Sequence, residues 1–375
     1  MESVASKDLL EAILGTDPTE LNAARARVLA SKGKGDINLV ADVEKEVKRA
    51  LQSSISFDPT DLATVEAGDQ RYCGGRFATP SIGELEASVI KRAAKGSPTP
   101  TISVIEGRDP VTDIGALQAM APASTLFQVA SQFNCLEAPG PRLVDVADYL
   151  YDRTQGPRAA LSAFPATLVR HYAAPDGRGG RFTQSLTHQI DLLAEALPAD
   201  LGRVKNGYLQ ASRIRDLGVA AAAVEQNFNQ IRVGVHDDAQ VVLGYSRDGV
   251  VEGEPRIAQV FTSTLATGGY GQGEAIAGPA EALCRQLLRA AYLGTLLAAV
   301  DLGKKRVPLT MIGGGVFGNP HELIVDSIVW AVDQVTALGS GPLTVVLNGR
   351  DLSQSVDRAW LRDECARRGG VYRKL

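Results

Sequence analysis

The sequence has 375 residues, of which 45% are hydrophobic and 22% charged, and its formal net charge is −4 at neutral pH. This is ordinary globular usage, so the chain can bury a sizeable core, and wholesale disorder is excluded. The length fits either one elaborated domain or two. A charge of −4 leaves no positive excess that could coat a nucleic acid or an anionic membrane. Any phosphate recognition must therefore be local.

Cysteine spacing and the N-terminus set the expected compartment. The four cysteines are widely separated, and none has the CxxC or Cys/His spacing of a metal site, which predicts reduced thiols and no bound metal. The N-terminus begins with Met1, Glu2 and Ser3 and has no apolar run, and the longest apolar stretch, 292–300, is too short to span a membrane. We expect a cytoplasmic protein with no nucleic-acid or membrane partner. Secretion as an effector, by signals that a dedicated machine reads, would leave no trace in these patterns.

Residues 6–52 carry apolar side chains at three-to-four spacing among charges, which predicts a helical layer. We assign 1–70 to a helical N-terminal extension and 71–375 to the catalytic domain. Ser81, followed three residues later by Glu84, is typical of a capping box and predicts a helix that runs to about residue 95.

From residue 99 onward, short apolar runs alternate with helical stretches, which predicts an α/β sheet. A turn at 247–249 between two apolar runs predicts a hairpin, so the sheet should be mixed. The predicted strands are 101–105, 125–131, 231–236, 240–245, 257–264, 306–312 and 343–347. The predicted helices are 158–171, 182–197, 279–302 and 321–337.

The strongest motif is a glycine run between a strand and a helix. The apolar segment 307–312 leads into the motif at 313–319, and a helix is expected from His321. Unpaired N–H groups and the positive end of the dipole favour an anion at such a helix start, so this segment has the build of a phosphate cradle. A tight structural turn is the alternative interpretation. Neither the GxxxxGK[ST] motif nor the dinucleotide-binding GxGxxG motif with its distant acid is matched.

Three segments together resemble the macrodomain superfamily. The segment 312–318 is similar to the second phosphate loop of macrodomains, 112–114 resembles their Gly-Asp-Ile motif, and 127–134 resembles the strand that ends in Asn-Ala-Ala-Asn. The resemblance implies that Asp113 accepts the adenine amino group and that Asn134 contacts a ribose. The implied ADP-ribose ligands are Asp113, Ile114, Gln132, Asn134, Thr154, Gln155, Gly156, Gly313, Gly314, Gly315, Val316, Phe317, Gly318 and Asn319.

The sequence also departs from the common macrodomain pattern. Ser131 stands in place of the first asparagine, and no Gly-Gly-Gly-Val loop follows Asn134. The segment 151–157 follows instead, with Pro157 suited to a first helical turn and amides that could face a diphosphate. These segments and the pattern at 233–238 resemble a divergent branch, the MavL-type ADP-ribosyl-arginine hydrolases. The resemblance covers about residues 70–350.

Carboxylates near the expected cleft are the candidates for chemistry. Asp237 and Asp238 leave a strand, and alternation places them on opposite faces, so only one should enter a cleft. The resemblance favours Asp238 as the catalytic carboxylate, with Asp237 and Asp152 next. Each of these could instead be a solvated turn residue. His236 is expected to be structural. Glu137 is a further candidate whose alternative is an exposed surface acid.

Two further loops, 206–208 and 268–271, could stack against a ligand or could be plain turns.

We therefore expect a three-layer α/β/α, macrodomain-like fold with a mixed sheet and a helical N-terminal extension. The resemblance implies a hydrolase that removes ADP-ribose from modified protein, with arginine as the favoured acceptor and ubiquitin as one candidate carrier. No metal and no cofactor are required. The alternative is a reader module that binds ADP-ribose without cleaving it, because one pocket serves both roles.

Overall fold

The computed structural model describes residues 15, 20, 23, 26, 36–92, 98–107, 113–140, 142–152, 154–244, 250–267, 276–349 and 356–374. The helices are α3 (Asp36–Arg49), α4 (Leu51–Ser54), α5 (Ile82–Arg92), α6 (Ile114–Met120), α7 (Gln155–Ser162), α8 (Phe164–Tyr172), α9 (Leu217–Gln226), α10 (Gly278–Asp301), α11 (His321–Ala337) and α12 (Arg358–Arg367), with short 3₁₀ turns η1 (Val146–Tyr151), η2 (Ala211–Arg213) and η3 (Phe228–Gln230). The strands are β1 (Ile55–Phe57), β2 (Ala63–Ala67), β3 (Gln70–Ala78), β4 (Thr101–Glu106), β5 (Leu126–Ala130), β6 (Ala174–Pro175), β7 (Arg181–Phe182), β8 (Leu209–Gln210), β9 (Gly234–Gln240), β10 (Arg256–Thr262), β11 (Leu265–Ala266), β12 (Arg306–Leu309), β13 (Thr344–Gly349) and β14 (Tyr372–Lys374).

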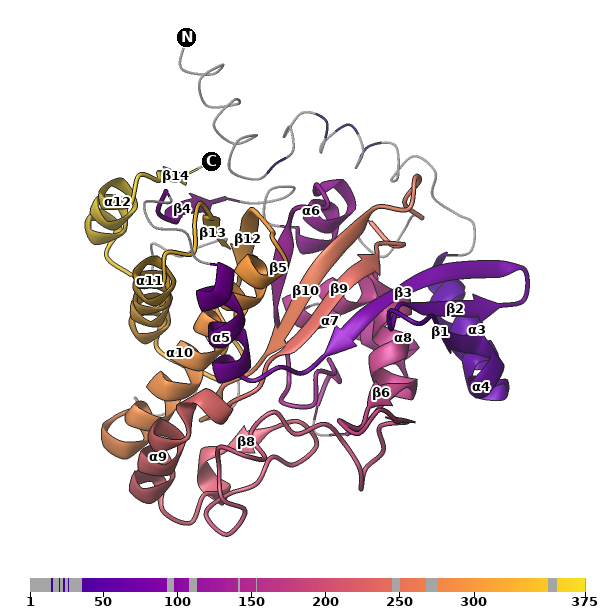
Figure 1. Cartoon of the computed structure of the whole chain (residues 1–375), viewed down its shortest axis with the longest axis horizontal. Helices are drawn as coiled ribbons and strands as arrows, with labels where there is room; N and C mark the ends of the chain where they lie inside the picture. Colours follow the sequence, from indigo (N-terminus) through magenta and orange to yellow (C-terminus); the bar gives the residue numbers. More distant parts are fainter. Residues whose placement is uncertain are drawn as a thin grey trace.

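Two sheets lie side by side and form the centre of the protein (Figure 1). One has six strands in the order β1-β2-β3-β9-β10-β5, and the other has the order β12-β13-β4-β14. A parallel bridge between Thr125 and Arg306 joins β5 to β12 across the two sheets. Strand β10 runs parallel to β5 and antiparallel to β9, so the sheet is mixed as predicted.

Helices cover both faces of these strands. The Gln128 side chain on β5 donates to the carbonyl of Ala291 in α10, whereas the Gln259 side chain on β10 donates to the carbonyl of Ala159 in α7. Side chains alternate between faces along a strand, and Gln259 pairs with Phe127, the residue before Gln128. The two glutamines therefore point to opposite faces, with α10 on one and α7 on the other. The predicted α/β class with a mixed sheet between helices is confirmed.

Helix α10 is the central helix of the core. By length and composition it could span a membrane, but 78% of its most apolar window is buried inside the protein. A helix that is apolar all round is the expected core helix of a large α/β protein. Together with α5, α9 and α11 it packs into the larger of two hydrophobic clusters, and α3, η1 and α8 belong to the smaller one.

The capping box and most of the predicted elements are present. The backbone N–H of Ser81 donates to the Glu84 carboxylate at 2.7 Å, and the Glu84 N–H donates to the Ser81 hydroxyl at 3.2 Å. The predicted helix 158–171 is instead two helices that meet at Ala163, whose backbone is not helical (φ −112°, ψ 54°). Pro165 fits this break because it belongs in the first turn of a new helix.

The predicted helix at 182–197 is wrong. The segment is irregular, although Leu192, Leu193 and Leu197 are buried at helical spacing. Tertiary hydrogen bonds replace the helical ones: the Gln184 amide donates to the carbonyls of Asn134 and Arg170, and the Leu192 N–H donates to Phe133. The hydrogen bonds to the loop after β5 therefore outweigh the helical propensity of the segment 182–197.

The N-terminal region is only partly helical. Helix α3 falls within the predicted helical range of 6–52 and α4 begins in it, whereas most of 6–35 lies outside the described residues. The unpredicted strands β1, β2 and β3 follow. The β2–β3 hairpin crosses the expected boundary at residue 70, and β3 pairs with β9 of the main sheet. The helical segment thus packs on an extension of the same sheet.

Candidate functional site

The glycine motif forms a loop that leaves the carboxyl end of β12 and enters α11. Gly313 has a φ of +74°, and a Cβ there would lie 2.6 Å from the Thr264 methyl group and would overlap the Asn319 side-chain amide. Gly318 also has a positive φ, of +71°. Only glycine adopts this backbone readily, so the loop depends on these residues.

Internal hydrogen bonds hold the glycine loop closed on one side. The Asn319 N–H donates to the Gly313 carbonyl at 3.0 Å, and the Gly318 N–H donates to the Gly315 carbonyl at 3.1 Å. On the outer side, Gly315 is exposed, and no atom lies within 4 Å of a Cβ built there. The loop therefore presents open backbone at Gly315, where a ligand can approach.

A pair of aromatic rings connects the glycine loop to the segment 206–208. The rings of Phe317 and Tyr208 have centroids 5.7 Å apart. The Phe317 carbonyl accepts a 2.7 Å hydrogen bond from the Thr267 hydroxyl, which follows β11. The Tyr208 hydroxyl accepts at 3.0 Å from the Gln132 amide, which in turn lies just beyond β5. Gln132 and Phe317, two of the predicted ligands, are thus brought together, and Tyr208 links them.

The loop after β5, residues 131–137, is buried and internally bonded. Asn134 is 1% exposed; its amide oxygen accepts from the Leu136 N–H, and its amide nitrogen donates to the Gln189 side chain. Cys135 has a φ of +60° and is buried in this loop. Asn134 therefore shapes the loop, and its predicted contact with a ribose stays a prediction.

A buried arginine on α8 anchors the same loop. The Arg170 guanidinium donates to the Cys135 carbonyl at 3.1 Å, bonds the His236 ring at 3.1 Å and lies over the Phe261 ring at 3.6 Å. The other His236 nitrogen lies 2.6 Å from the Gly74 carbonyl, so it carries the proton. Burial lowers the pKa of His236 well below its usual value, and the charge of Arg170 adds to this. These contacts fit the structural role expected for His236.

Glu137 closes the loop against the start of α7. Its side chain belongs to a residue that is 4% exposed, and Oε1 has no hydrogen-bond partner among the described residues. A Cβ on Gly156 would overlap Glu137 Oε2 and the carbonyl of Ala130, so glycine is needed for this contact. Burial raises the pKa of the Glu137 carboxyl well above its usual range, and the negative charge of Asp152 contributes to the rise. The alternative of an exposed surface acid is excluded.

Asp152 lies just before α7 and is half-buried. Its Oδ1 accepts from the backbone N–H of Thr154 at 2.8 Å and from the Thr154 hydroxyl at 2.7 Å. Thr154 and Gly156 thus lie at the start of α7 as predicted, and the side chain of Gln155 lies outside the described residues. Two carboxyl groups, one buried and one accessible, flank this helix start.

Asp113 is held by α7. Its carboxylate caps α6 by accepting from the N–H groups of Gly115 and Ala116, and both oxygens accept from the Arg158 guanidinium at 2.7 and 3.0 Å. Ile114 is buried beside it, and Thr112 lies outside the described residues. These contacts explain Asp113 as a cap and an ion-pair partner, while its contact with adenine stays a prediction.

Asp237 and Asp238 do not lie where the sequence placed them. In place of the predicted strands 231–236 and 240–245, the structure has one strand, β9, over 234–240. Asp238 lies inside it at a φ of +57°, in the irregular part of the register. The bulge turns both carboxylates toward Arg76, which Asp238 contacts at 2.6 Å and Asp237 at 3.5 Å. The expectation of opposite faces is therefore wrong.

The same two aspartates also lie away from the glycine loop. Asp237 is 2.8 Å from Lys304, which precedes β12, whereas the glycine loop follows β12. Along β9, Asp238 lies four residues, about 13 Å, from Gly234, which pairs near the carboxyl end of β10. The structure does not bring Asp237 or Asp238 to the ring pair or to α7.

Of the loops considered in the sequence, 268–271 and the predicted hairpin turn at 247–249 lie outside the described residues. The burial of Glu137 was missed because helices that come later in the chain cover it. The only available signal was the order of strand, loop and helix that leads from β5 through 131–137 to Gly156.

No known family model matches the sequence, and no curated protein sequence matches it either. Among solved structures, poly(ADP-ribose) glycohydrolase from Thermomonospora curvata is similar, with 15% identity, a TM-score of 0.37, and coverage of 88% of this chain and 99% of that one. Poly(ADP-ribose) glycohydrolase from Deinococcus radiodurans in complex with ADP-ribose shows 13% identity, a TM-score of 0.39, and coverage of 78% and 95%. At these identities and TM-scores the likeness carries no information on the activity of this protein. The likeness to MavL-type hydrolases stays a prediction.

Proposed function

We propose that this protein binds ADP-ribose at the carboxyl ends of β5, β10 and β12 and hydrolyses an ADP-ribosyl bond. The favoured substrate is ADP-ribose attached to a protein through arginine, an acceptor that rests on the sequence resemblance alone. Ubiquitin is one candidate carrier.

The observation that carries the proposal is the convergence of three segments at one edge of the parallel strands. The open glycine loop follows β12, the loop 131–137 follows β5, and α7 begins against Glu137. Tyr208 joins the first two through Phe317 and Gln132. Ligands of open α/β sheets bind outside the carboxyl ends of the strands, so phosphates at the glycine loop and a sugar toward α7 fit this edge.

The two carboxyl groups at α7 supply the groups that such a hydrolysis needs. The raised pKa of Glu137 favours its protonated form, while Asp152 is more accessible, and carboxyls with different environments take acid and base roles. In the proposed reaction, water adds to the anomeric carbon of the ribose, the bond to the acceptor breaks, and the acceptor leaves with a proton. An ionised Asp152 would stabilise the positive charge that develops on the sugar.

The experiment measures release of ADP-ribose by mass spectrometry. Proteins modified on arginine, glutamate and serine are tested together with poly(ADP-ribose). We expect release from the arginine-linked substrate, and a fall in rate on the order of 10²–10³ for Asp152→Asn, as for the loss of one electrostatic stabiliser. The matched control is Asp148→Asn, an exposed aspartate on η1.

The outcomes separate the readings. Binding of ADP-ribose without release from any substrate would support the reader module instead. If the wild type releases ADP-ribose and the Asp152→Asn variant does so at the same rate, the protein is a hydrolase but Asp152 is not its catalytic carboxylate. Absence of ADP-ribose binding at millimolar ligand would overturn the proposed function.

A further inference from the structure

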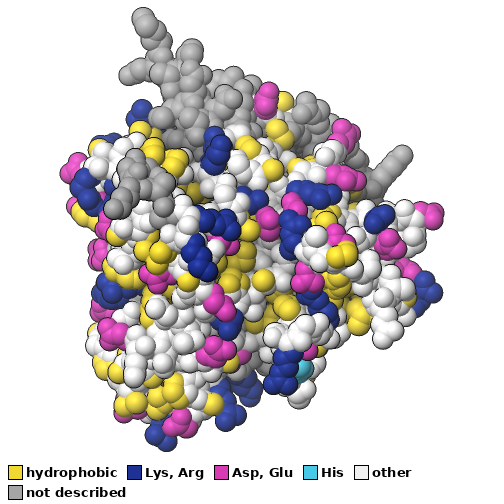
Figure 2. All heavy atoms as spheres, viewed as in Figure 1, with side chains coloured by type: hydrophobic (Ala, Val, Ile, Leu, Met, Phe, Trp, Pro, Cys, Tyr) yellow, Lys and Arg dark blue, Asp and Glu magenta, His cyan; other side chains and the backbone are white. Residues whose placement is uncertain are grey.

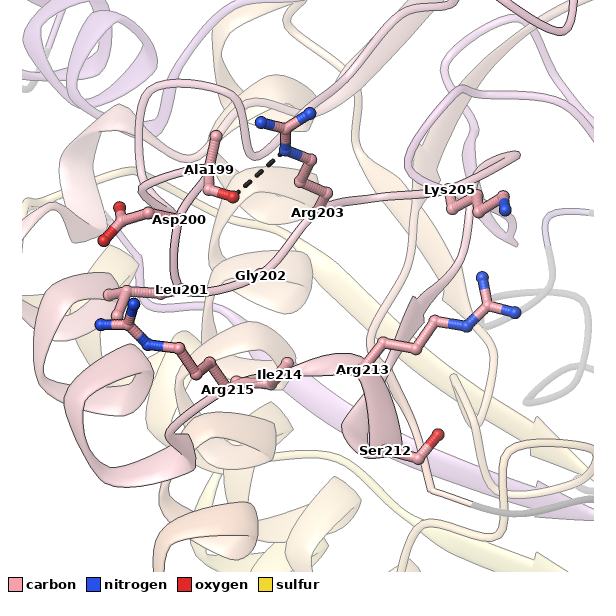
Figure 3. A pocket seen from close by; sticks show the side chains of 10 residues that line it. All are labelled: Ala199, Asp200, Leu201, Gly202, Arg203, Lys205, Ser212, Arg213, Ile214 and Arg215. Carbon is pink, nitrogen blue, oxygen red and sulfur yellow. Dashed lines mark hydrogen bonds between the residues drawn. The ribbon is translucent and has the colours of Figure 1, made fainter.

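A second candidate site lies beside the ring pair, in a basic hollow formed by residues 199–205 and 212–215. Its volume is about 420 Å³. Figure 3 shows the side chains of three arginines and one lysine spread around it, and Asp200 is the carboxylate among the lining residues. The cationic lining residues are Arg203, Lys205, Arg213 and Arg215.

The backbone under the basic hollow is fixed. The Arg215 N–H donates to the Leu201 carbonyl at 2.9 Å, and Leu201 and Ile214 are both buried. A Cβ on Gly202 would lie 3.2 Å from the Ile214 side chain, so the two segments are in close contact. Arg203 donates to the Ala199 carbonyl at 3.1 Å, the dashed line in Figure 3. The cations therefore project from packed backbone, which reduces the entropy lost when a ligand binds.

The charge of the basic hollow is unusual for this chain. About half of the described arginines elsewhere pair with carboxylates, as Arg158 does with Asp113 and Arg232 with two glutamates. Within the described ranges, none of the four cations of the hollow forms an ion pair with a carboxylate. On the face drawn in Figure 2, acidic and basic side chains are interspersed. An acidic protein that leaves these cations unpaired in one hollow has local phosphate-binding chemistry available there.

The segment 205–208 connects the basic hollow to the proposed ADP-ribose site. Lys205 and Tyr208 exchange backbone hydrogen bonds at 2.9 and 3.0 Å, and Tyr208 packs on Phe317 of the glycine loop. Strand β8, which follows directly, pairs with β11, and Thr267 after β11 bonds the Phe317 carbonyl. A ligand that leaves the ring pair along this segment therefore meets the basic hollow next.

We propose that the basic hollow binds phosphate groups of a substrate that extends beyond the ADP-ribose held at the glycine loop. The inference rests on the proposed function. Guanidinium groups bind phosphate oxygens in pairs, and aromatic rings beside a cationic groove are the usual surface for an extended nucleotide ligand. The adjacent ring pair favours such a ligand over an acidic peptide, which needs cations but no stacking surface.

The first test uses tripolyphosphate as the probe and calorimetry as the measurement. The variant is Arg213→Gln with Arg215→Gln. Both side chains are exposed and make no side-chain hydrogen bond within the described residues, so the fold should survive. The control is Arg71→Gln with Arg178→Gln, two exposed arginines outside the hollow. We expect binding about tenfold weaker in the first variant and unchanged in the control, with salt weakening the wild type. Equal affinities in all three proteins would overturn the proposal.

The second test identifies the source of the phosphates. The ligands are ADP-ribose, its dimer, a single-stranded oligonucleotide of similar charge and a polyglutamate peptide. We expect the dimer or the oligonucleotide to bind more tightly than ADP-ribose, and the Arg213→Gln, Arg215→Gln variant to lose this gain while its affinity for ADP-ribose is kept. The ligand that binds more tightly than ADP-ribose identifies the molecule whose phosphates the hollow binds. A gain that only polyglutamate shows would overturn the proposal.

The two proposals fail in distinguishable ways. The protein could bind tripolyphosphate through Arg213 and Arg215 and yet not bind ADP-ribose. That result would refute the proposed function and keep the phosphate site in the hollow. If the protein binds ADP-ribose but no ligand binds more weakly to the Arg213→Gln, Arg215→Gln variant, the proposed function stands and the phosphate site in the hollow is refuted.

Discussion

Replacing Gly315 by valine tests the glycine loop as a phosphate cradle. Gly313 is unsuitable for this purpose, because its φ of +74° and the overlap with Asn319 would make any side chain disrupt the loop itself. Gly315 has neither problem, since no heavy atom lies within 4 Å of its Cβ and its φ is not in the left-handed region. The variant therefore changes the surface that a ligand meets and leaves the loop in place.

The magnitudes follow from this difference. The free energy of unfolding should change by less than about 0.5 kcal/mol, as for exposed substitutions without strain. A branched side chain between the backbone amides and a phosphate would remove at least one hydrogen bond to a charged group, worth about 1.5–3 kcal/mol. ADP-ribose affinity should therefore fall by about 10- to 150-fold.

The assay is calorimetry with ADP-ribose, combined with urea denaturation of the same samples. Gly140→Val is the control, because a Cβ there also meets no atom within 4 Å and Gly140 lies outside the loop. Unchanged affinity in a stable Gly315→Val protein would refute the cradle and make the motif a structural turn. Loss of stability together with affinity would refute the reading of Gly315 as open backbone.

Four further outcomes are expected. Gly156→Ala should lower the free energy of unfolding by about 1–3 kcal/mol in urea denaturation, because its Cβ overlaps a carbonyl and a buried carboxyl; an unchanged midpoint would show that α7 can shift. Asp238→Asn should cost less than about 1 kcal/mol, since its ion pair is partly exposed, and should leave turnover within about twofold, whereas a fall of about 10²–10³ would return the chemistry to β9. Asp113→Asn should weaken ADP-ribose binding by about 1.5–3 kcal/mol in calorimetry if its carboxylate also accepts from adenine, and unchanged affinity would leave it as a cap and ion-pair partner. Burial lowers the pKa of His236 well below that of the unfolded chain, so the unfolded state binds more protons and the free energy of unfolding should fall as the pH drops below about 6.5. His236→Gln should flatten this pH dependence between about pH 7.5 and 5.5. An unchanged pH dependence in the variant would show that other groups cause it.

Features that depend on local chemistry could be predicted from the sequence. The Ser81–Glu84 capping box needs only two side chains three residues apart, and the glycine loop is marked by a strand, a glycine run and a helix in succession. The alternation of strands and helices gave the α/β class for the same reason.

Features that depend on distant partners could not be predicted. The leucines at 192–197 have helical spacing, but hydrogen bonds to the loop after β5 hold the segment in turns. The bulge at Asp238 follows from pairing with β10, and Glu137 is buried by α7 and α8, which come later in the chain. The glycine loop was therefore placed correctly at the end of a strand, whereas Asp238, the carboxylate that the sequence favoured for catalysis, forms an ion pair with Arg76 away from that loop.

The buried guanidinium of Arg170 has a consequence for how the site moves. It ties α8 to the 131–137 loop through Cys135, to β9 through His236 and to β10 through Phe261. Opening the loop alone would break its hydrogen bond from Arg170 to the Cys135 carbonyl, and a hydrogen bond from a charged group is worth about 1.5–3 kcal/mol. Amide hydrogen exchange in 131–137 should therefore be slow for a loop, because each local opening breaks this bond.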